Sequence, residues 1–281
     1  MNLITSLIPR DVAPLFRPLL RELISLLRGL GPRDWERQTV AVGWRVRDVA
    51  AHLLDVELRK IAAYRDDHDV SSGATMESDR DLSRLVNGLN AGGVAFAARL
   101  SPRLIVDLLE VTGAWAADVI EALPTFERAR YAVSWAGESE SQNWMDVGRD
   151  YTERWHHQAQ IRDAVGVRRL LEPRWMEPLL EFSIRALPAA YSAISAPAST
   201  AVTLIVEGET SGQWSVVRGE DTWEIFHGAP PAPAAMVDIS TDDAWRLFYN
   251  ALSPAALAER VRVAGDLALA EPLLRVRSVI L

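Results

Sequence analysis

The first 165 residues carry apolar side chains at helical intervals. Leucines recur every three or four positions through 11–30, which predicts an amphipathic helix that starts late, because Pro14 and Pro18 fit only a first turn. The same period predicts helices over 46–64 and 144–165, and two helical pieces over 79–123 that break at Ser101-Pro102. A polar loop is expected over 66–78, and Gly166 is expected to end the last helix. Helices of this length predict a four-helix bundle.

After Arg169 the pattern changes to short apolar runs between turns. One more helix is expected over 172–194, followed by a linker at 195–199. Runs rich in β-branched and aromatic residues predict strands at 201–206, 213–217, 222–226, 236–239 and 261–264. Helical patterns cover 242–252, 255–260 and 266–276. The fold class expected is therefore α+β, with a helical domain over 1–168 and a smaller α+β domain over 169–281.

Composition narrows the class of protein. The 281 residues are 49% apolar and 24% charged, which is typical of a globular protein with a substantial core. No run approaches the ~20 apolar residues of a membrane span, and the first ten residues lack a signal-peptide pattern, so we expect a cytoplasmic protein without membrane contact. The net charge of -8 argues against nucleic acid as a partner.

The chain contains no cysteine and only one lysine, Lys60. Disulfides, zinc-finger sites and a thiol nucleophile of the protein itself are therefore excluded. A metal site would need histidine and carboxylate ligands, and any thiol chemistry would need a thiol from outside the chain.

Three residues have a spacing that suits a metal ion. Glu153 and His157 are four residues apart on one predicted helix, so their side chains lie on one face about a turn apart. His52, with apolar helical neighbours, is the natural third ligand. Two imidazoles and one carboxylate leave coordination positions open, as catalytic metals require. The alternative is a surface pair of Glu153 with His157 and a core histidine at 52, and an apolar stripe on the opposite helix face favours it.

Further residues are candidates for the surroundings of this site. His156 competes with His157 as a partner of Glu153, and both His156 and Gln160 are candidate second-shell or substrate contacts. Trp135 precedes the Glu153 helix in a loop and is a candidate for shaping the mouth of the site. The other tryptophans, Trp44 among them, are expected to be structural.

Three segments resemble a known family. Residues 43–53, Gly43-Trp44-x-Val46-Arg47-Asp48-Val49-x-Ala51-His52-Leu53, are similar to the N-terminal signature of the DinB-like, mycothiol-dependent maleylpyruvate isomerases. Glu153-x-Trp155-x-His157 with 161–166 resembles the second signature of that family, and 263–274 resembles its sterol-carrier-like C-terminal domain. The resemblance implies a DinB-like bundle that binds a divalent metal, most often zinc, through His52, Glu153 and His157.

The resemblance also implies mycothiol as cosubstrate. We expect first a metal-dependent S-transferase that transfers the mycothiol thiolate to a small electrophile. The second choice is a maleylpyruvate-type cis-trans isomerase with arginine anchors such as Arg246, Arg260 or Arg262. A third possibility is a metal-binding or ligand-binding protein without turnover, whose C-terminal aromatic residues would line an apolar pocket. The sequence leaves the electrophile and the oligomeric state open.

Overall fold

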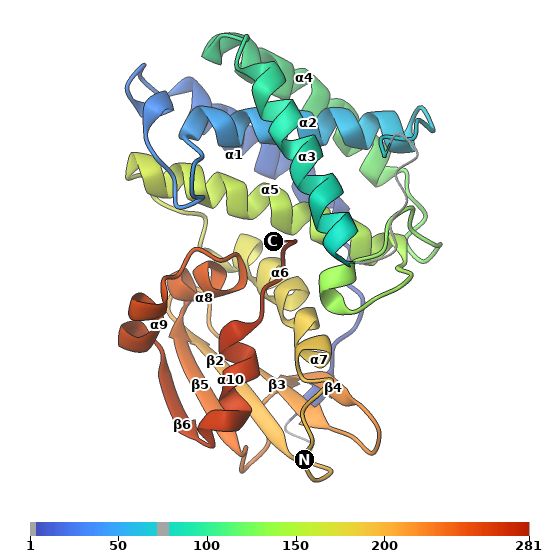
Figure 1. Ribbon diagram of the computed structural model, residues 1–281, viewed down its shortest axis with the longest axis vertical. Coiled ribbons are helices and arrows are strands. Elements are labelled where there is room, and N and C mark those ends of the chain that lie inside the picture. Colours follow the sequence, from blue (N-terminus) through green and yellow to red (C-terminus); the bar gives the residue numbers. More distant parts are fainter. Residues whose placement is uncertain (1–3, 72–78, 281) are drawn as a thin grey trace. The chain divides into compact units, whose positions relative to one another are not determined.

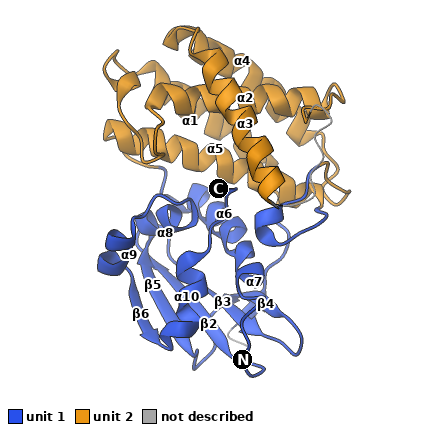
Figure 2. Ribbon diagram, in the orientation of Figure 1, with its two compact units in different colours: residues 1–10, 131–141, 170–280 blue, residues 11–130, 142–169, 281 orange. Residues whose placement is uncertain are grey.

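The computed structural model describes residues 4–71 and 79–280, so residues 72–78 of the expected polar loop lie outside the described residues. The chain forms two compact units (Figure 2). One contains residues 11–130 and 142–169, and the other contains residues 4–10, 131–141 and 170–280. The division into domains 1–168 and 169–281 stays a prediction.

The first unit is a helical bundle. Its helices are α1 (Phe16–Arg28), α2 (Val46–Tyr64), α3 (Asp79–Ala97), α4 (Pro102–Glu121) and α5 (Asn143–Val165) (Figure 1). Helix α4 packs against α1 and α2, while α2 also contacts α3 and α5. Leucine, valine and isoleucine side chains from α1, α2, α4 and α5 share one core, including Leu27, Val49, Leu53, Leu109 and Ile161.

Local sequence explains where these helices begin and end. Pro14 lies in a single 3-10 turn, Ala13–Leu15, and α1 begins directly after it. The Ser101 hydroxyl accepts a hydrogen bond from the Leu104 N–H and caps α4. Gly166 ends α5 with a φ of +72°, a conformation that glycine adopts without strain.

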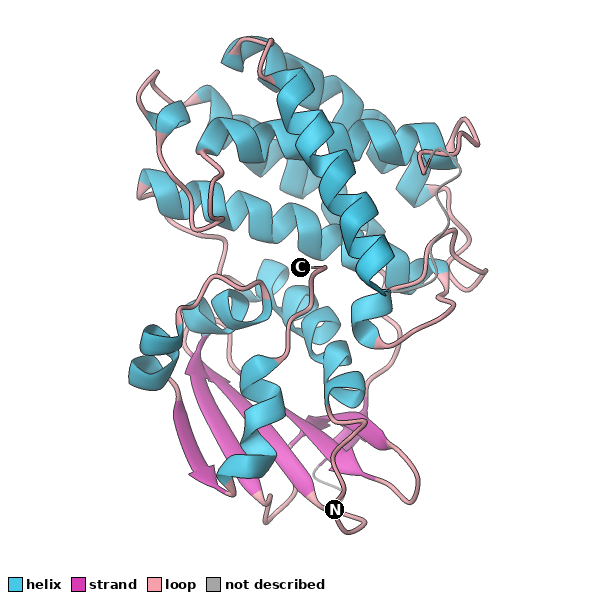
Figure 3. Ribbon diagram, viewed as in Figure 1, coloured by secondary structure: helices cyan, strands magenta, loops and turns pink. Residues whose placement is uncertain are grey.

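The second unit is a six-stranded sheet with helices. The strands are β1 (Ile4–Ser6), β2 (Ala201–Glu207), β3 (Gly212–Arg218), β4 (Trp223–Gly228), β5 (Ala235–Ser240) and β6 (Arg262–Gly265), in the order β1-β4-β3-β2-β5-β6. Among the strand pairs of residues 4–71 and 79–280, β2–β5 is parallel and the others are antiparallel. The helices are α6 (Pro173–Ser183), α7 (Leu187–Ala190), α8 (Thr241–Phe248), α9 (Pro254–Arg260) and α10 (Leu267–Arg275) (Figure 3). Helices α7, α8 and α10 contact the strands. The α+β class, with a helical bundle followed by a smaller α+β part, is confirmed.

Two details differ from the expectation. The single helix expected over 172–194 is three pieces: α6, the 3-10 turn Ile184–Ala186, and α7. Pro188 explains the break, because it has no N–H and crowds the preceding turn. Strand β1 was not expected, because three residues show no alternation; it pairs at the sheet edge with residues 226–228 of β4.

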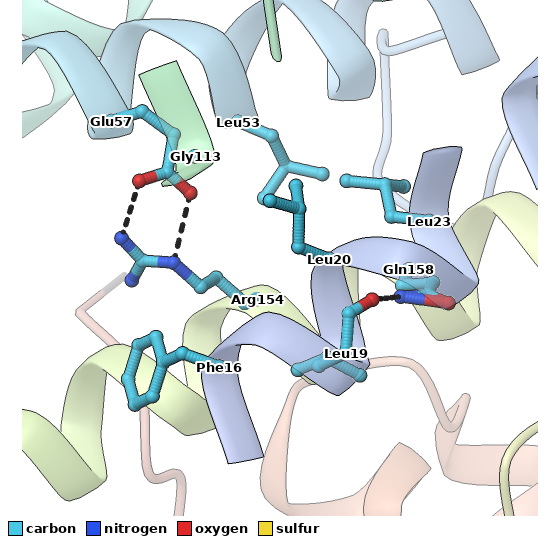
Figure 4. A pocket seen from close by; sticks show the side chains of 9 residues that line it. All are labelled: Phe16, Leu19, Leu20, Leu23, Leu53, Glu57, Gly113, Arg154 and Gln158. Atoms are coloured by element: carbon cyan, nitrogen blue, oxygen red, sulfur yellow. Dashed lines mark hydrogen bonds and ion pairs between the residues drawn. The ribbon is translucent and has the colours of Figure 1, made fainter. Parts of the chain in front are cut away.

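A buried ionic network ties α2 to α5. The ammonium group of Lys60 lies 2.7 Å from Asp150 and 3.3 Å from Asp146. The guanidinium of Arg154 binds Glu57 through two hydrogen bonds of 2.9 Å each (Figure 4). The side chains of these five residues are at most 9% exposed. Because these ions lie on facing sides of two helices, their pairing fixes the register of α2 against α5.

We expect Lys60→Met to lower the free energy of unfolding by about 3–5 kcal/mol, because it leaves two buried carboxylates without their ammonium partner. Urea unfolding measures the change. The matched control is Arg84→Met, since Arg84 pairs with Asp81 at the surface with a side chain 68% exposed, and its loss should cost less than about 1 kcal/mol. Equal losses in the two variants would contradict the role given to the buried network.

Candidate metal centre

Helix α2 places His52 inside the bundle. Val46, Val49 and Leu53 are fully buried on the core side of α2, and this stripe orients the helix. The Asp48 carboxylate accepts a hydrogen bond from the Arg45 N–H at the first turn. His52 follows in the second turn and is 4% exposed.

Helix α5 supplies the other two side chains. Glu153 and His157 lie one turn apart, with the His157 Nε2 3.5 Å from the Glu153 Oε2. The opposite stripe, which includes Tyr151 and Trp155, is also buried. Both faces of α5 are therefore covered, which explains why the apolar stripe alone favoured a surface position for Glu153.

The three predicted ligands converge. One ligand atom each of His52, Glu153 and His157 lies within 4.8 Å of the others. The rings of His52 and His157 are 4.6 Å apart with an interplanar angle of 70°. The His157 Nδ1–H donates a hydrogen bond of 2.9 Å to the Gln160 Oε1, which leaves Nε2 as the ring nitrogen on the side of Glu153.

The electrostatics suit a cation at this point. Burial, followed by the neighbouring His157, lowers the pKa of His52 well below its usual value, so the imidazole is neutral and able to ligate. Burial alone would raise the pKa of Glu153, but the neighbouring His156, His157 and His52 outweigh it and the pKa is lowered. The Nδ1 atom of His52 is buried without a hydrogen-bond partner. Two imidazoles and a carboxylate fit a divalent ion, and the unpartnered nitrogen of His52 is available as a ligand atom.

The remaining candidates occupy different positions. His156 is buried, its Nδ1 donates to the Thr152 carbonyl at 2.9 Å, and it is not one of the three converging residues. Its ring lies 4.0 Å from the ring of His157. Gln160 contacts the site through His157. Trp135 belongs to the other compact unit, in the 3-10 turn Ser134–Ala136, and its place at the site stays a prediction.

The three arginines named as anchors also lie in that other unit, and each has an acidic partner. Arg246 pairs with Asp242 at 3.3 Å, Arg260 with Asp243 at 3.3 Å, and Arg262 with Glu207 at 3.5 Å. Their role as anchors stays a prediction.

Sequence reasoning missed Trp44. Its ring centroid lies 5.0 Å from that of His52 and 6.2 Å from that of His157. The available signal was that Trp44 belongs to the same motif as His52. The motif alone does not predict that the turn before α2 places the indole beside His52, in the second turn of the helix.

A cavity of about 20 Å³ lies among α1, α2, α4 and α5, beside the Arg154–Glu57 pair (Figure 4). Four of the nine residues that line it are leucines. The volume suits one water molecule and is too small for an organic substrate, so this cavity is not a substrate site.

Comparison with known proteins identifies the family. The model for the mycothiol maleylpyruvate isomerase N-terminal domain matches residues 16–162, just over half of the chain and the whole segment that carries the three ligands. The chain belongs to this family. No curated protein matches the sequence.

Solved structures show the same fold. The crystal structure of a mycothiol-dependent maleylpyruvate isomerase is 12% identical and matches 91% of this chain and 92% of that chain with a TM-score of 0.55. A histidine-to-alanine mutant of such an isomerase matches with 13% identity, the same shares of both chains and a TM-score of 0.52. Sterol Carrier Protein 2 Like 2 from Aedes aegypti, 19% identical, matches 34% of this chain and 94% of that chain with a TM-score of 0.28, which by itself supports no inference about fold.

Across the two described stretches of the chain, every helix is too short or too polar to span a lipid bilayer.

We expect His52→Ala to remove the bound divalent metal while the bundle stays folded, because the apolar stripes of α2 and α5 remain. Metal content is measured by elemental analysis after dialysis, and folding by circular dichroism. The control is His68→Ala, which removes an exposed histidine near the end of α2 and should keep full metal content. Full metal content in the His52 variant would show that His52 is not a ligand.

We expect His156 to make the metal-free protein less stable in acid. Burial, then the neighbouring His157, lowers the pKa of His156 from its usual 6.5 to about 3. Below pH 6.5 the unfolded chain therefore binds a proton that the folded chain rejects, and the free energy of unfolding falls by about 1.4 kcal/mol per pH unit. In His156→Asn this contribution disappears. Urea unfolding at pH 7.5 and pH 5 measures how much the free energy of unfolding falls between the two pH values. This fall should be smaller by about 2 kcal/mol in His156→Asn than in the wild type, and equal falls would contradict the lowered pKa of His156.

Proposed function

We propose that this chain is a metal-dependent enzyme that uses mycothiol to isomerise a small, electrophilic cis-alkene of the maleylpyruvate type. The observation that carries the proposal is the convergence of His52, Glu153 and His157 in a member of the mycothiol maleylpyruvate isomerase family. Family membership supports isomerisation ahead of the S-transfer that the sequence analysis placed first.

His52, Glu153 and His157 would hold the ion, for which zinc is the natural candidate because it accepts two imidazoles and a carboxylate in a tetrahedral site with one open position. A zinc ion bound there lowers the pKa of a thiol that reaches it and so supplies a thiolate near neutral pH. The thiol must come from outside, because the chain has no cysteine.

The residues of the chain prepare this position in three ways. Glu153 contributes negative charge, which offsets part of the charge of a divalent ion. The Gln160 Oε1 accepts a hydrogen bond from the His157 Nδ1–H and so orients the ring with Nε2 as the nitrogen that can ligate. Burial keeps His52 neutral, so no proton has to leave that ring before it ligates.

The proposed reaction is balanced without any other reactant. The thiolate sulfur forms a bond to one carbon of the cis double bond, and the π electrons of that bond move onto the conjugated carbonyl oxygen. Rotation about the resulting carbon–carbon single bond follows. The electrons then return, the carbon–sulfur bond breaks, and the trans isomer and the thiolate are released. S-transfer would differ only in that the adduct is protonated on carbon and keeps its carbon–sulfur bond.

We expect the purified protein to convert maleylpyruvate to its trans isomer only when both mycothiol and metal are present. An anaerobic assay followed by proton NMR detects the isomer, and a chelator should abolish the reaction. Glu153→Gln and His157→Ala should lower the rate by at least about a hundredfold, while the exposed His68→Ala should not change it.

Mass spectrometry of the same mixtures separates the alternatives. A stable mycothiol conjugate with no isomer would establish S-transfer instead. Binding of metal or of an apolar ligand without turnover of any electrophile would support a carrier and overturn the enzymatic proposal.

A further inference from the structure

A tight turn holds Trp44 in front of α2. The Trp44 N–H donates to the Ala41 carbonyl at 3.0 Å, and Gly43 has a φ of +80°, which the third position of a type II turn requires. A Cβ atom added at Gly43 would have no neighbour within 4 Å. Glycine is therefore needed there for its backbone conformation and not for space.

The backbone of Trp44 is fixed from a second direction. Its carbonyl oxygen accepts hydrogen bonds from the Thr39 N–H at 3.0 Å, the Thr39 hydroxyl at 2.8 Å and the Gln38 side-chain amide at 2.8 Å. Three donors on one carbonyl leave this residue little freedom. Because α2 begins two residues later, the indole is held in a fixed place relative to His52.

The indole lies against both imidazoles of the candidate metal centre. The plane of the indole makes an angle of 52° with the His52 ring and of 25° with the His157 ring. Trp44 also packs on the apolar core of the bundle and is half-buried. The three rings thus form one cluster that is supported from the core side.

The two imidazoles differ in what orients them. Gln160 fixes His157 through a hydrogen bond. Within residues 4–71 and 79–280, no hydrogen bond holds the His52 ring, and its Nδ1 is buried without a partner. Rotation of an imidazole about its second side-chain torsion is soft. Packing against neighbouring side chains must therefore orient His52, and Trp44 is a ring neighbour that is not a candidate ligand.

We propose that Trp44 is a positioning residue of the metal centre: its indole holds the His52 ring in the orientation that converges with Glu153 and His157 before a metal ion binds. The inference rests on the metal site of the proposed function. Ordering the ligand in advance lowers the entropy lost on binding, so Trp44 contributes to metal affinity without touching the metal.

Cobalt(II) is the probe, because its visible absorption reports both affinity and coordination geometry. Metal-free Trp44→Leu should bind cobalt about tenfold more weakly than the wild type, with a changed spectrum. Trp44→Phe, which keeps a flat ring, should recover most of the affinity. Gly43→Ala should weaken binding with the indole still present, because alanine disfavours the positive φ of the turn.

The matched control is Trp115→Leu, which removes an exposed tryptophan on α4 and should leave cobalt affinity and spectrum unchanged. Thermal unfolding of each metal-free variant measures the structural effect separately. If Trp44→Leu does not fold, Trp44→Phe and Gly43→Ala test the positioning role instead. That role requires Trp44→Phe to keep its cobalt affinity and Gly43→Ala to bind cobalt more weakly.

Two results overturn the inference and are distinguishable. Equal cobalt affinity and spectrum in wild type, Trp44→Leu and Gly43→Ala would remove the role of Trp44 and leave the metal site standing. Absence of cobalt binding by the wild-type protein would overturn the metal site itself, and the inference with it.

Discussion

The register between α2 and α5 is the constraint on which the candidate site depends. One candidate ligand comes from α2 and two from α5, so a shift of one helix by a single turn, about 5.4 Å, would separate His52 from Glu153 and His157. Two different interactions resist that shift. The apolar core packs Leu53 and Val49 near Ile161 at one end, and the ion pairs of Lys60 with Asp146 and Asp150 fix the other.

Local sequence was enough to predict most of the elements. The stripe of α2 gave its bounds, 46–64, and Ser101-Pro102 and Gly166 marked helix ends, because caps and prolines act within a few residues. The strands after residue 200 followed from β-branched runs between turns. Local sequence could not predict β1, whose three residues pair with a strand more than 200 positions away.

The site was predicted only in part, because it too depends on contacts between segments that are distant in the sequence. The spacing of Glu153 and His157 is local, and it indicated that they share a helix face. How far that face is buried depends on how helices from distant stretches pack, and the apolar stripe opposite Glu153 and His157 favoured a surface position for the pair. The apolar helical neighbours of His52 indicated it as the third ligand, and the family resemblance supported that choice. Neither source of information identified Trp44, whose position depends on a turn at 41–44 and on donors from Gln38 and Thr39.

The charges along α5 separate a structural role from a ligand role for its buried acids. Asp146 and Asp150, with Glu57 of α2, meet three cations, Lys60, Arg149 and Arg154, so the network is balanced in itself. Glu153 lies outside these ion pairs and faces the imidazole of His157. The Glu153 side chain is only 19% exposed, and a carboxylate largely withdrawn from water is costly unless a cation supplies its countercharge. The first acids of α5 thus pair with cations of the chain and fix α2, whereas Glu153 is left with imidazole neighbours at the candidate metal centre.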